Sequence, residues 1–448
     1  MALKPLNGVQ NPATLKPVLP LLHAVPPTAP LDAAWRARWL LAAPHRLAFM
    51  TGAFLLALSA LWWCVLLWMR LFGGNDGVHV PWAVSPNSAH ALVMGLGFFP
   101  LFFAGFLFTA GPKWLGMPEV PARQLLPQMV MMVLGWAVCL LGFHVSHFLV
   151  ATGLMAIASA WTSLTIKFGK LWHASRAPDK AHASVVVVAS ALGALAMWVV
   201  VAGMLAQAET MVRSATQAAL WIFIATVFAT VSHRMIPFFS ASSLPFLDAW
   251  RPLWLLWCMV GVLCFEGVVA CSDLWLWPSP QAWRWLQVMV EAPAAALLLW
   301  LAIRWGLVQS LKIRMLAMLH GGFLWLGIAL ALQAVSHSLM ALTQDQTSLG
   351  LAPLHAMTMG YLGATMFAMA TRVSSGHSGR PLAADNIAWG LYWMVQLAVL
   401  LRVVHALWPN AGAWPLLSAI AAWTLACCGW ALRYGNWFGR PRADGRAG

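Results

Sequence analysis

Charged residues are scarce in this chain of 448 residues: 8% are Asp, Glu, Lys or Arg, whereas 61% are hydrophobic. Acidic residues are the scarcest, with 12 Asp and Glu against 26 Lys and Arg. Soluble globular domains carry about 25% charged residues, so this composition excludes that class.

Several chemical motifs are also missing. The chain has no Walker lysine motif, no C-x-x-C-H and no G-x-G-x-x-G at a strand–helix junction, which argues against an ATPase, a c-type cytochrome and a dinucleotide enzyme. The seven Cys form no C-x-x-C pair and lie mostly within apolar runs, so we assign them no chemistry. The first 44 residues lack the apolar core of a signal peptide, and no cleavage is expected.

What the chain has in abundance is long apolar runs. Each is about 20 residues long, enough to cross a bilayer as a helix, because lipid cannot satisfy open backbone groups. We therefore predict an all-α polytopic membrane protein with about twelve transmembrane helices. The predicted spans are 47–69, 89–110, 124–143, 146–167, 183–206, 216–236, 251–271, 283–305, 315–339, 353–371, 386–407 and 412–433.

The basic residues are scattered in short loops, which is typical of membrane topology and not of a nucleic-acid interface. With the N-terminus inside, all but four of the 26 Lys and Arg fall on the inner side, and both termini are predicted to be cytoplasmic. The exceptions are Arg70, Arg213, Arg284 and Arg402. We predict a cytoplasmic arm at 1–44, a transmembrane domain at 45–434 and a basic cytoplasmic tail at 435–448.

Half of the fourteen histidines fall near the predicted outer ends of spans. Ionisable groups at membrane depth are costly and usually face a cavity, and imidazole is a common ligand of haem iron and copper. These residues are therefore candidate metal ligands, although a single interfacial His can equally be hydrogen-bonded to a neighbour. They are His79, His90, His144, His147, His337, His355 and His405.

Two of these histidines open near-identical hexapeptides, HALVMG at His90 and HAMTMG at His355. His and Met at i and i+4 share a helix face, so two such helices can hold one haem b between two imidazoles, with Met94 and Met359 packing on the ring. Gly97 and Gly363 are expected to leave room for the flat ring. Chance repetition within packed membrane helices is the alternative.

Two carboxylates lie within apolar spans, Glu266 and Glu291, and Pro293 is expected to break the helical hydrogen-bond ladder locally beside the second one. They are candidate catalytic proton carriers or partners of a metal-bound His, and a neutral structural Glu is the alternative. Arg402 lies three residues before His405 and is a candidate contact for a haem propionate, or else an ordinary interfacial Arg.

The segment LHAMTMGYLGATMFAMATRVSSGHSGRPL, from Leu354 to Leu382, closely resembles the signature region of the NnrS family. Two further stretches resemble that family, GFFPLFFAGFLFTAGPKWLG from Gly97 and SHRMIPFF from Ser232. The resemblance implies a bacterial inner-membrane protein that carries haem and copper and is linked to nitric oxide, denitrification and nitrosative stress.

One departure concerns the family's H-x-H-E pattern in the second span. It falls on His90 to Val93, where Leu92 and Val93 replace the second His and the Glu, so copper is less well supported than haem. The layout also resembles that of haem–copper oxidase catalytic subunits, which hold a haem between His on spans 2 and 10. His90 and His355 occupy those spans, but the oxidases' paired His-His is missing.

The sequence thus favours a haem-binding membrane protein that acts on nitric oxide or in response to it, with catalysis as a haem-dependent oxidoreductase left open. A secondary transporter explains twelve spans and Glu291 beside Pro293 without a cofactor. A non-catalytic assembly partner in denitrification is the third reading.

Overall fold

The computed structural model describes residues 34–72 and 80–445, and within these ranges every regular element is a helix. The predicted all-α polytopic fold is confirmed. Most of the predicted arm at 1–44 lies outside the described residues, as does His79. The described part of the arm contains a short 3₁₀ helix, η1, at Ala37–Ala42.

Eleven helices of the described chain are long and apolar enough to cross a membrane. Nine of these run without interruption. They are α1 (Pro44–Phe72), α4 (Leu126–Val145), α5 (His147–Ala174), α6 (Ala181–Leu205), α9 (Leu253–Trp275), α10 (Gln281–Arg304), α12 (Arg314–Thr343), α15 (Asn386–Leu407) and α16 (Trp414–Phe438). Pro293 lies inside α10, which continues past it although the proline has no backbone N–H to donate.

Three composite helices contain a π-helical stretch, in which each turn is wider than in an α-helix. Two of them complete the eleven, and the third covers the predicted tenth span, so twelve helical segments follow one another in the predicted order. They are α2–η2–α3 (Pro86–Leu92, Val93–Gly97, Phe99–Leu115), α7–η4–α8 (Glu209–Ala218, Ala219–Ala225, Thr226–Ser243) and α13–η5–α14 (Ala352–His355, Ala356–Gly363, Ala364–His377).

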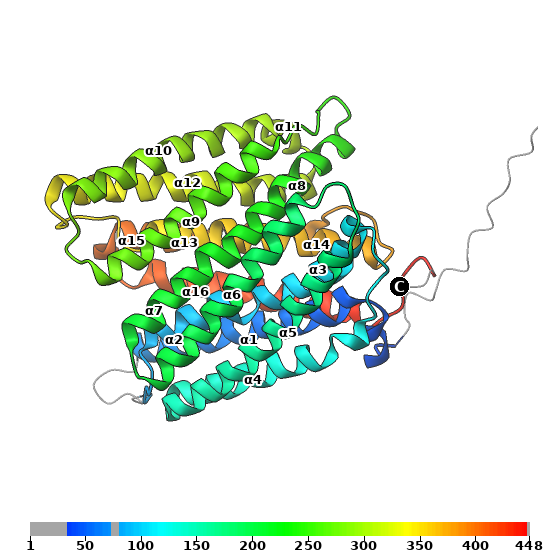
Figure 1. The fold of residues 1–448 in the computed structure, drawn as a ribbon, viewed down its shortest axis with the longest axis horizontal. Helices are drawn as coiled ribbons and strands as arrows, with labels where there is room; N and C mark the ends of the chain where they lie inside the picture. The colour runs from blue at the N-terminus through cyan, green and yellow to red at the C-terminus, as the bar shows by residue number, and fades with distance from the viewer. Residues whose placement is uncertain (1–33, 73–79, 446–448) are drawn as a thin grey trace, which may run out of the picture.

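The composite helices lie in the interior of the bundle. Within the most apolar stretch of Pro86–Leu115, 78% of residues are buried, against 33% for α10. Figure 1 shows the same arrangement, with α10 along one edge, α4 along the opposite edge, and α2, α13 and α16 between them. Polar side chains on the composite helices are therefore shielded from lipid by the outer helices.

The bundle has a terminal end, where α1 begins and α16 ends, and a distal end, where α1 ends and α2 begins (Figure 1). The distal end also holds the α9–α10 and α12–α13 connections. At the terminal end the backbone N–H of Arg36 donates to the carbonyl of Gly439 at 2.8 Å. The first and last described segments are thus neighbours. The predicted common side for both termini agrees with this geometry, while its cytoplasmic assignment stays a prediction.

We expect reporter fusions to show opposite signals at the two ends. Green fluorescent protein, which reports a cytoplasmic location, should give a signal when it is fused after residue 448. Alkaline phosphatase, which reports a periplasmic location, should be active when it is inserted at 344–351, between α12 and α13. Alkaline phosphatase and green fluorescent protein fusions measure this directly. A periplasmic signal from the C-terminal fusion would contradict the sidedness assigned here.

Candidate haem pocket

A cavity lies toward the distal end, between α1, α2–η2–α3, α13–η5, α15 and α16. Aliphatic and aromatic side chains dominate its wall. The lining residues are Trp63, Leu67, His90, Met94, Phe98, Phe99, His355, Thr358, Met359, Arg402, Leu416, Ala419, Ile420 and Trp423.

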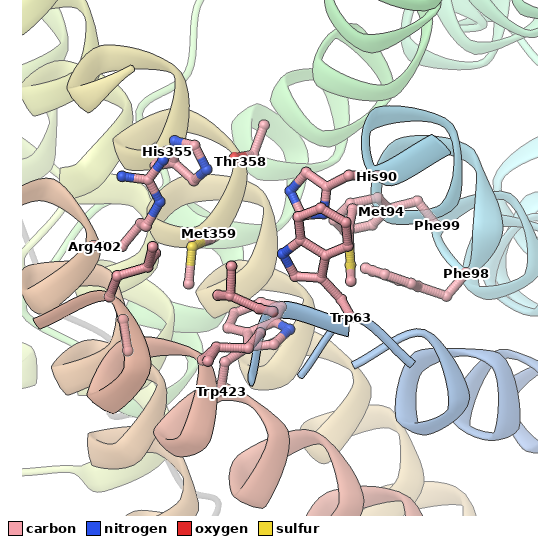
Figure 2. A pocket seen from close by; sticks show the side chains of 14 residues that line it. Trp63, His90, Met94, Phe98, Phe99, His355, Thr358, Met359, Arg402 and Trp423 are labelled. Atoms are coloured by element: carbon pink, nitrogen blue, oxygen red, sulfur yellow. The ribbon is translucent and has the colours of Figure 1, made fainter. Parts of the chain in front are cut away.

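All five residues predicted to bind a cofactor line this one cavity: His90, Met94, His355, Met359 and Arg402. The two histidines are 265 positions apart in the chain and come from different composite helices. Figure 2 shows His355 and Arg402 on one side of the pocket, and His90 with Trp63 and Met94 on the other. The geometry therefore places an imidazole on each of two sides of a shared space.

His355 is held by the backbone of its own helix. Its Nδ1 lies 2.9 Å from the carbonyl oxygen of Leu351, which can only accept, so Nδ1 carries the hydrogen. The lone pair of the neutral ring is then on Nε2. Histidines that bind metals usually donate their other ring N–H to a carbonyl or carboxylate in this way, which fixes the tautomer and the ring plane.

His90 is held by stacking. Its ring lies 4.2 Å from that of Trp63, centroid to centroid, with 30° between the planes. Its Nδ1 is buried without a hydrogen-bond partner. A buried polar atom without a partner costs about 1–3 kcal/mol, so this nitrogen is suited to a ligand, and the residues fit a group that takes two axial imidazoles.

Both hexapeptides coincide with π-helical turns, a feature that the sequence did not predict. His90 precedes η2 and His355 precedes η5, so that Met94 and Met359 lie within widened turns and still face the pocket. Single π-helical turns inside α-helices often occur at functional sites. Both copies of the hexapeptide thus contain a widened turn, although η2 begins three residues after His90 and η5 begins directly after His355.

The glycines after the histidines have roles other than the predicted one, since neither lines the pocket. Gly97 lines a separate small cavity beside Trp136. A Cβ atom at Gly363 would lie 2.8 Å from the ring of Trp423, so this glycine allows Trp423 to pack against η5 and form part of the pocket wall.

Arg402 carries the only formal charge among the described residues that line the pocket. It comes from α15, next to His355 in Figure 2. The hydroxyl of Thr358 donates to the carbonyl of Leu354 at 2.8 Å, which leaves its oxygen free to accept. An anionic group at this edge of the pocket would therefore meet a guanidinium, the side chain best suited to carboxylates.

The other predicted metal ligands do not line the pocket. His144 has both ring nitrogens engaged, accepting from Trp62 Nε1 at 3.3 Å and facing the carbonyl of Pro81 at 2.9 Å. His147 Nε2 lies 2.8 Å from Gln207 Nε2, and His405, at the end of α15, has a buried Nδ1 without a partner.

His337 also lies outside the pocket. Its Nδ1 is 2.8 Å from an oxygen of Glu291, and its Nε2 is 4.0 Å from Asp273, so both nitrogens face carboxylates and we assign neither to a metal. No cluster of three or more His, Cys, Asp or Glu side chains suited to a metal ion occurs within residues 34–72 and 80–445. The binding of copper stays a prediction.

The candidate catalytic carboxylates Glu266 and Glu291 are buried, as predicted, but they lie on α9 and α10 and do not line the pocket. Conversely, sequence reasoning missed the wall contributed by α1 and α16, above all Trp63 and Trp423. The chain has 29 Trp, and no spacing marks these two.

The family model described as NnrS protein matches residues 39–442, nearly the whole chain. The match includes every helix from α1 to α16, and therefore both hexapeptides and all lining residues of the pocket. No curated protein matches the chain.

Proposed function

The chain belongs to the NnrS family, and on this premise we propose that it is a nitric-oxide-related inner-membrane protein whose pocket holds one haem b between His90 and His355. The observation that carries the proposal is the pairing of the two imidazoles in one cavity. Each comes from a copy of the hexapeptide, and the ring of His355 is oriented by the Leu351 carbonyl.

A haem would supply an iron centre that changes oxidation state and binds diatomic gases. The protein's own residues have separate tasks. His355 and His90 present ring nitrogens from two sides, and the thioethers of Met94 and Met359 offer polarisable contacts to a flat ring. Trp63 fixes the plane of His90, and the aromatic wall limits the access of water.

Purified full-length protein should show a Soret band and sharp visible bands that change on reduction with dithionite. Anaerobic addition of nitric oxide to the reduced protein should then shift the Soret band. A protein purified in folded form without any haem absorption would end this proposal and favour a carrier or an assembly partner. Haem absorption insensitive to nitric oxide would limit the role to electron transfer or structure.

Arg402 is expected to set the electrostatic environment of the pocket and not the axial ligation. Arg402→Gln should keep the low-spin spectrum but lower the midpoint potential by tens of millivolts, because losing a nearby positive charge favours the oxidised haem. Redox titration of the wild type and the variant measures the shift. Arg402→Lys, which keeps the charge, is the control, and an equal shift in both variants would contradict the assignment.

A further inference from the structure

A second buried polar network lies at the distal end, on α9, α10 and α12, outside the haem pocket. Glu266, Arg284, Glu291 and His337 are each 3% exposed or less, although α10 lies at the edge of the bundle. Glu266 and Asp273 are seven residues apart on α9, and Arg284 and Glu291 are seven apart on α10, so each pair shares one helix face.

One arm of this network connects the protein surface to the interior. The side chain of Asp273 is 25% exposed, and its Oδ2 lies 4.0 Å from Nε2 of His337. On the other side of the same ring, Nδ1 lies 2.8 and 2.9 Å from the two oxygens of Glu291. His337 therefore stands between a surface carboxylate and a fully buried one, and an imidazole in that position can take a proton on one nitrogen and release it from the other.

The other arm is ionic and fixes the network in place. Arg284 donates from Nη1 to Asp273 at 2.8 Å and from Nε to Asp345 at 2.9 Å. It also donates to the side-chain oxygen of Gln287 at 3.1 Å. Arg284 is one of the few basic residues predicted on the outer side, and this pairing explains a buried cation at that end.

Glu266 lies at the inner end of the network. Both of its carboxyl oxygens are buried, no donor from another side chain or the backbone reaches them, and the carboxyl group of Glu291 is near enough to share a hydrogen with that of Glu266. Two adjoining buried carboxyl groups can share one hydrogen, whereas two adjoining buried carboxylates repel each other. We therefore expect a proton on this pair.

The charge of the whole network leads to the same conclusion. The groups that face one another are Glu266 and Asp273 from α9, Arg284 and Glu291 from α10, His337 from α12, and Asp345 from the connection after α12. Four carboxyl groups thus share one guanidinium and one imidazole. Even with the imidazole protonated, full ionisation would leave a net charge of two negative units on this network, which favours the binding of protons there.

We propose that this network is a proton-binding site that opens at the distal end, with Asp273, His337 and Glu291 as the entry route and Glu266 as the carboxyl that holds the proton. Gln287 Nε2 and Arg284 Nη2 are buried donors without partners in the same network and are suited to a bridging water. The proposal depends neither on haem nor on nitric oxide, and it adds a proton-handling function to the membrane domain.

The test uses N,N′-dicyclohexylcarbodiimide, an apolar reagent for protonated carboxyl groups, on full-length protein in membranes, with peptide mass spectrometry as the readout. Glu266 should be labelled, and the labelling should fall about tenfold or more as the pH is raised across the range in which it loses its proton. Glu266→Gln should abolish this adduct, and Asp248→Asn, at an exposed carboxylate paired with Arg304, should not affect it.

Infrared spectroscopy gives a second readout that does not need labelling. The carbonyl band of a buried carboxylic acid should be present in the wild type, disappear in Glu266→Gln and persist in Asp248→Asn. His337→Gln should keep the band but slow its shift in deuterated buffer about tenfold or more, because the entry route is interrupted.

Three results would overturn the proposal. The first is an unlabelled Glu266 at every pH, together with an undiminished carboxyl band in Glu266→Gln. The second is labelling that millimolar Ca²⁺ or Zn²⁺ suppresses but raised pH does not, which would identify a metal site. The third is unchanged deuterium exchange in His337→Gln, which would remove the entry route.

Discussion

Replacing His90 or His355 by Ala should remove most of the haem, or convert a six-coordinate low-spin spectrum into a five-coordinate one. The two imidazoles are the only nitrogen ligands with a free lone pair that the described pocket wall offers on opposite sides. Each His→Ala change also leaves space for a small ligand, so added imidazole should restore part of the spectrum. Haem content per protein and the Soret position measure both effects.

Two control variants separate ligation from packing. His405→Ala removes a histidine from the same end of the bundle that does not line the pocket, and should leave the spectrum unchanged. Met94→Leu keeps the volume of a lining residue and should also change little, because the thioether there is expected to pack and not to ligate. If both His→Ala proteins keep an unaltered low-spin spectrum, the hexapeptide repeat is a coincidence of packing.

The second large effect is expected at a single glycine of the repeat. Gly95 and Gly360 occupy the same hexapeptide position, but their surroundings differ. A Cβ atom at Gly360 would lie 2.7 Å from the ring of Trp325, whereas at Gly95 nothing lies within 4 Å. The Trp325 ring is held by its Nε1, which donates to Gln396 at 2.8 Å, so it can yield little.

Gly360→Ala should therefore lower the free energy of unfolding by about 1–3 kcal/mol through overpacking. Gly95→Ala should leave it unchanged or raise it by up to about 1 kcal/mol, because alanine loses less backbone entropy in a helix than glycine. Thermal unfolding of the two variants in the same detergent compares them directly. Equal stabilities of the two variants would show that Gly360 is not required for the close packing of η5 on α12.

The fold could be predicted from the sequence because a bilayer restricts the backbone conformations that a membrane-spanning segment can adopt. Apolar runs of about 20 residues must be helices, and the structure has a helical segment for each of the twelve predicted spans. The tenth span is the one outside the eleven most apolar helices, and it contains polar residues such as His355, Thr358 and Thr365.

The pocket was only partly readable. The hexapeptide repeat identified two of its walls, because His and Met at i and i+4 share a helix face in both copies. The walls from α1 and α16 depend on how helices distant in the sequence pack together. The sequence periodicity of α1 or α16 alone does not predict that Trp63 and Trp423 line the pocket. The π-helical turns were equally invisible, because their extra residue per turn is stabilised by surrounding contacts and not by a residue type.

Position along the helix axis also predicted the pocket-lining residues less well than orientation around the axis would have done. Arg402 and His405 lie one turn apart on α15, but only Arg402 lines the pocket. Residues three apart differ by about 60° around an α-helix, which is enough to turn one of them out of a narrow cavity. For the same reason His144, His147 and His337, predicted at similar depth, face partners of their own.

Near-infrared magnetic circular dichroism of the oxidised, purified protein tests the central claim most directly, because it identifies both axial ligands of a low-spin haem. The lining residues that offer a nitrogen or sulfur ligand are His90, Met94, His355 and Met359. The spectrum therefore distinguishes ligation by two histidines from ligation by one histidine and one methionine. Our account predicts two imidazoles. A charge-transfer band of the His–Met type, or the absence of any haem signal from folded protein, would contradict it.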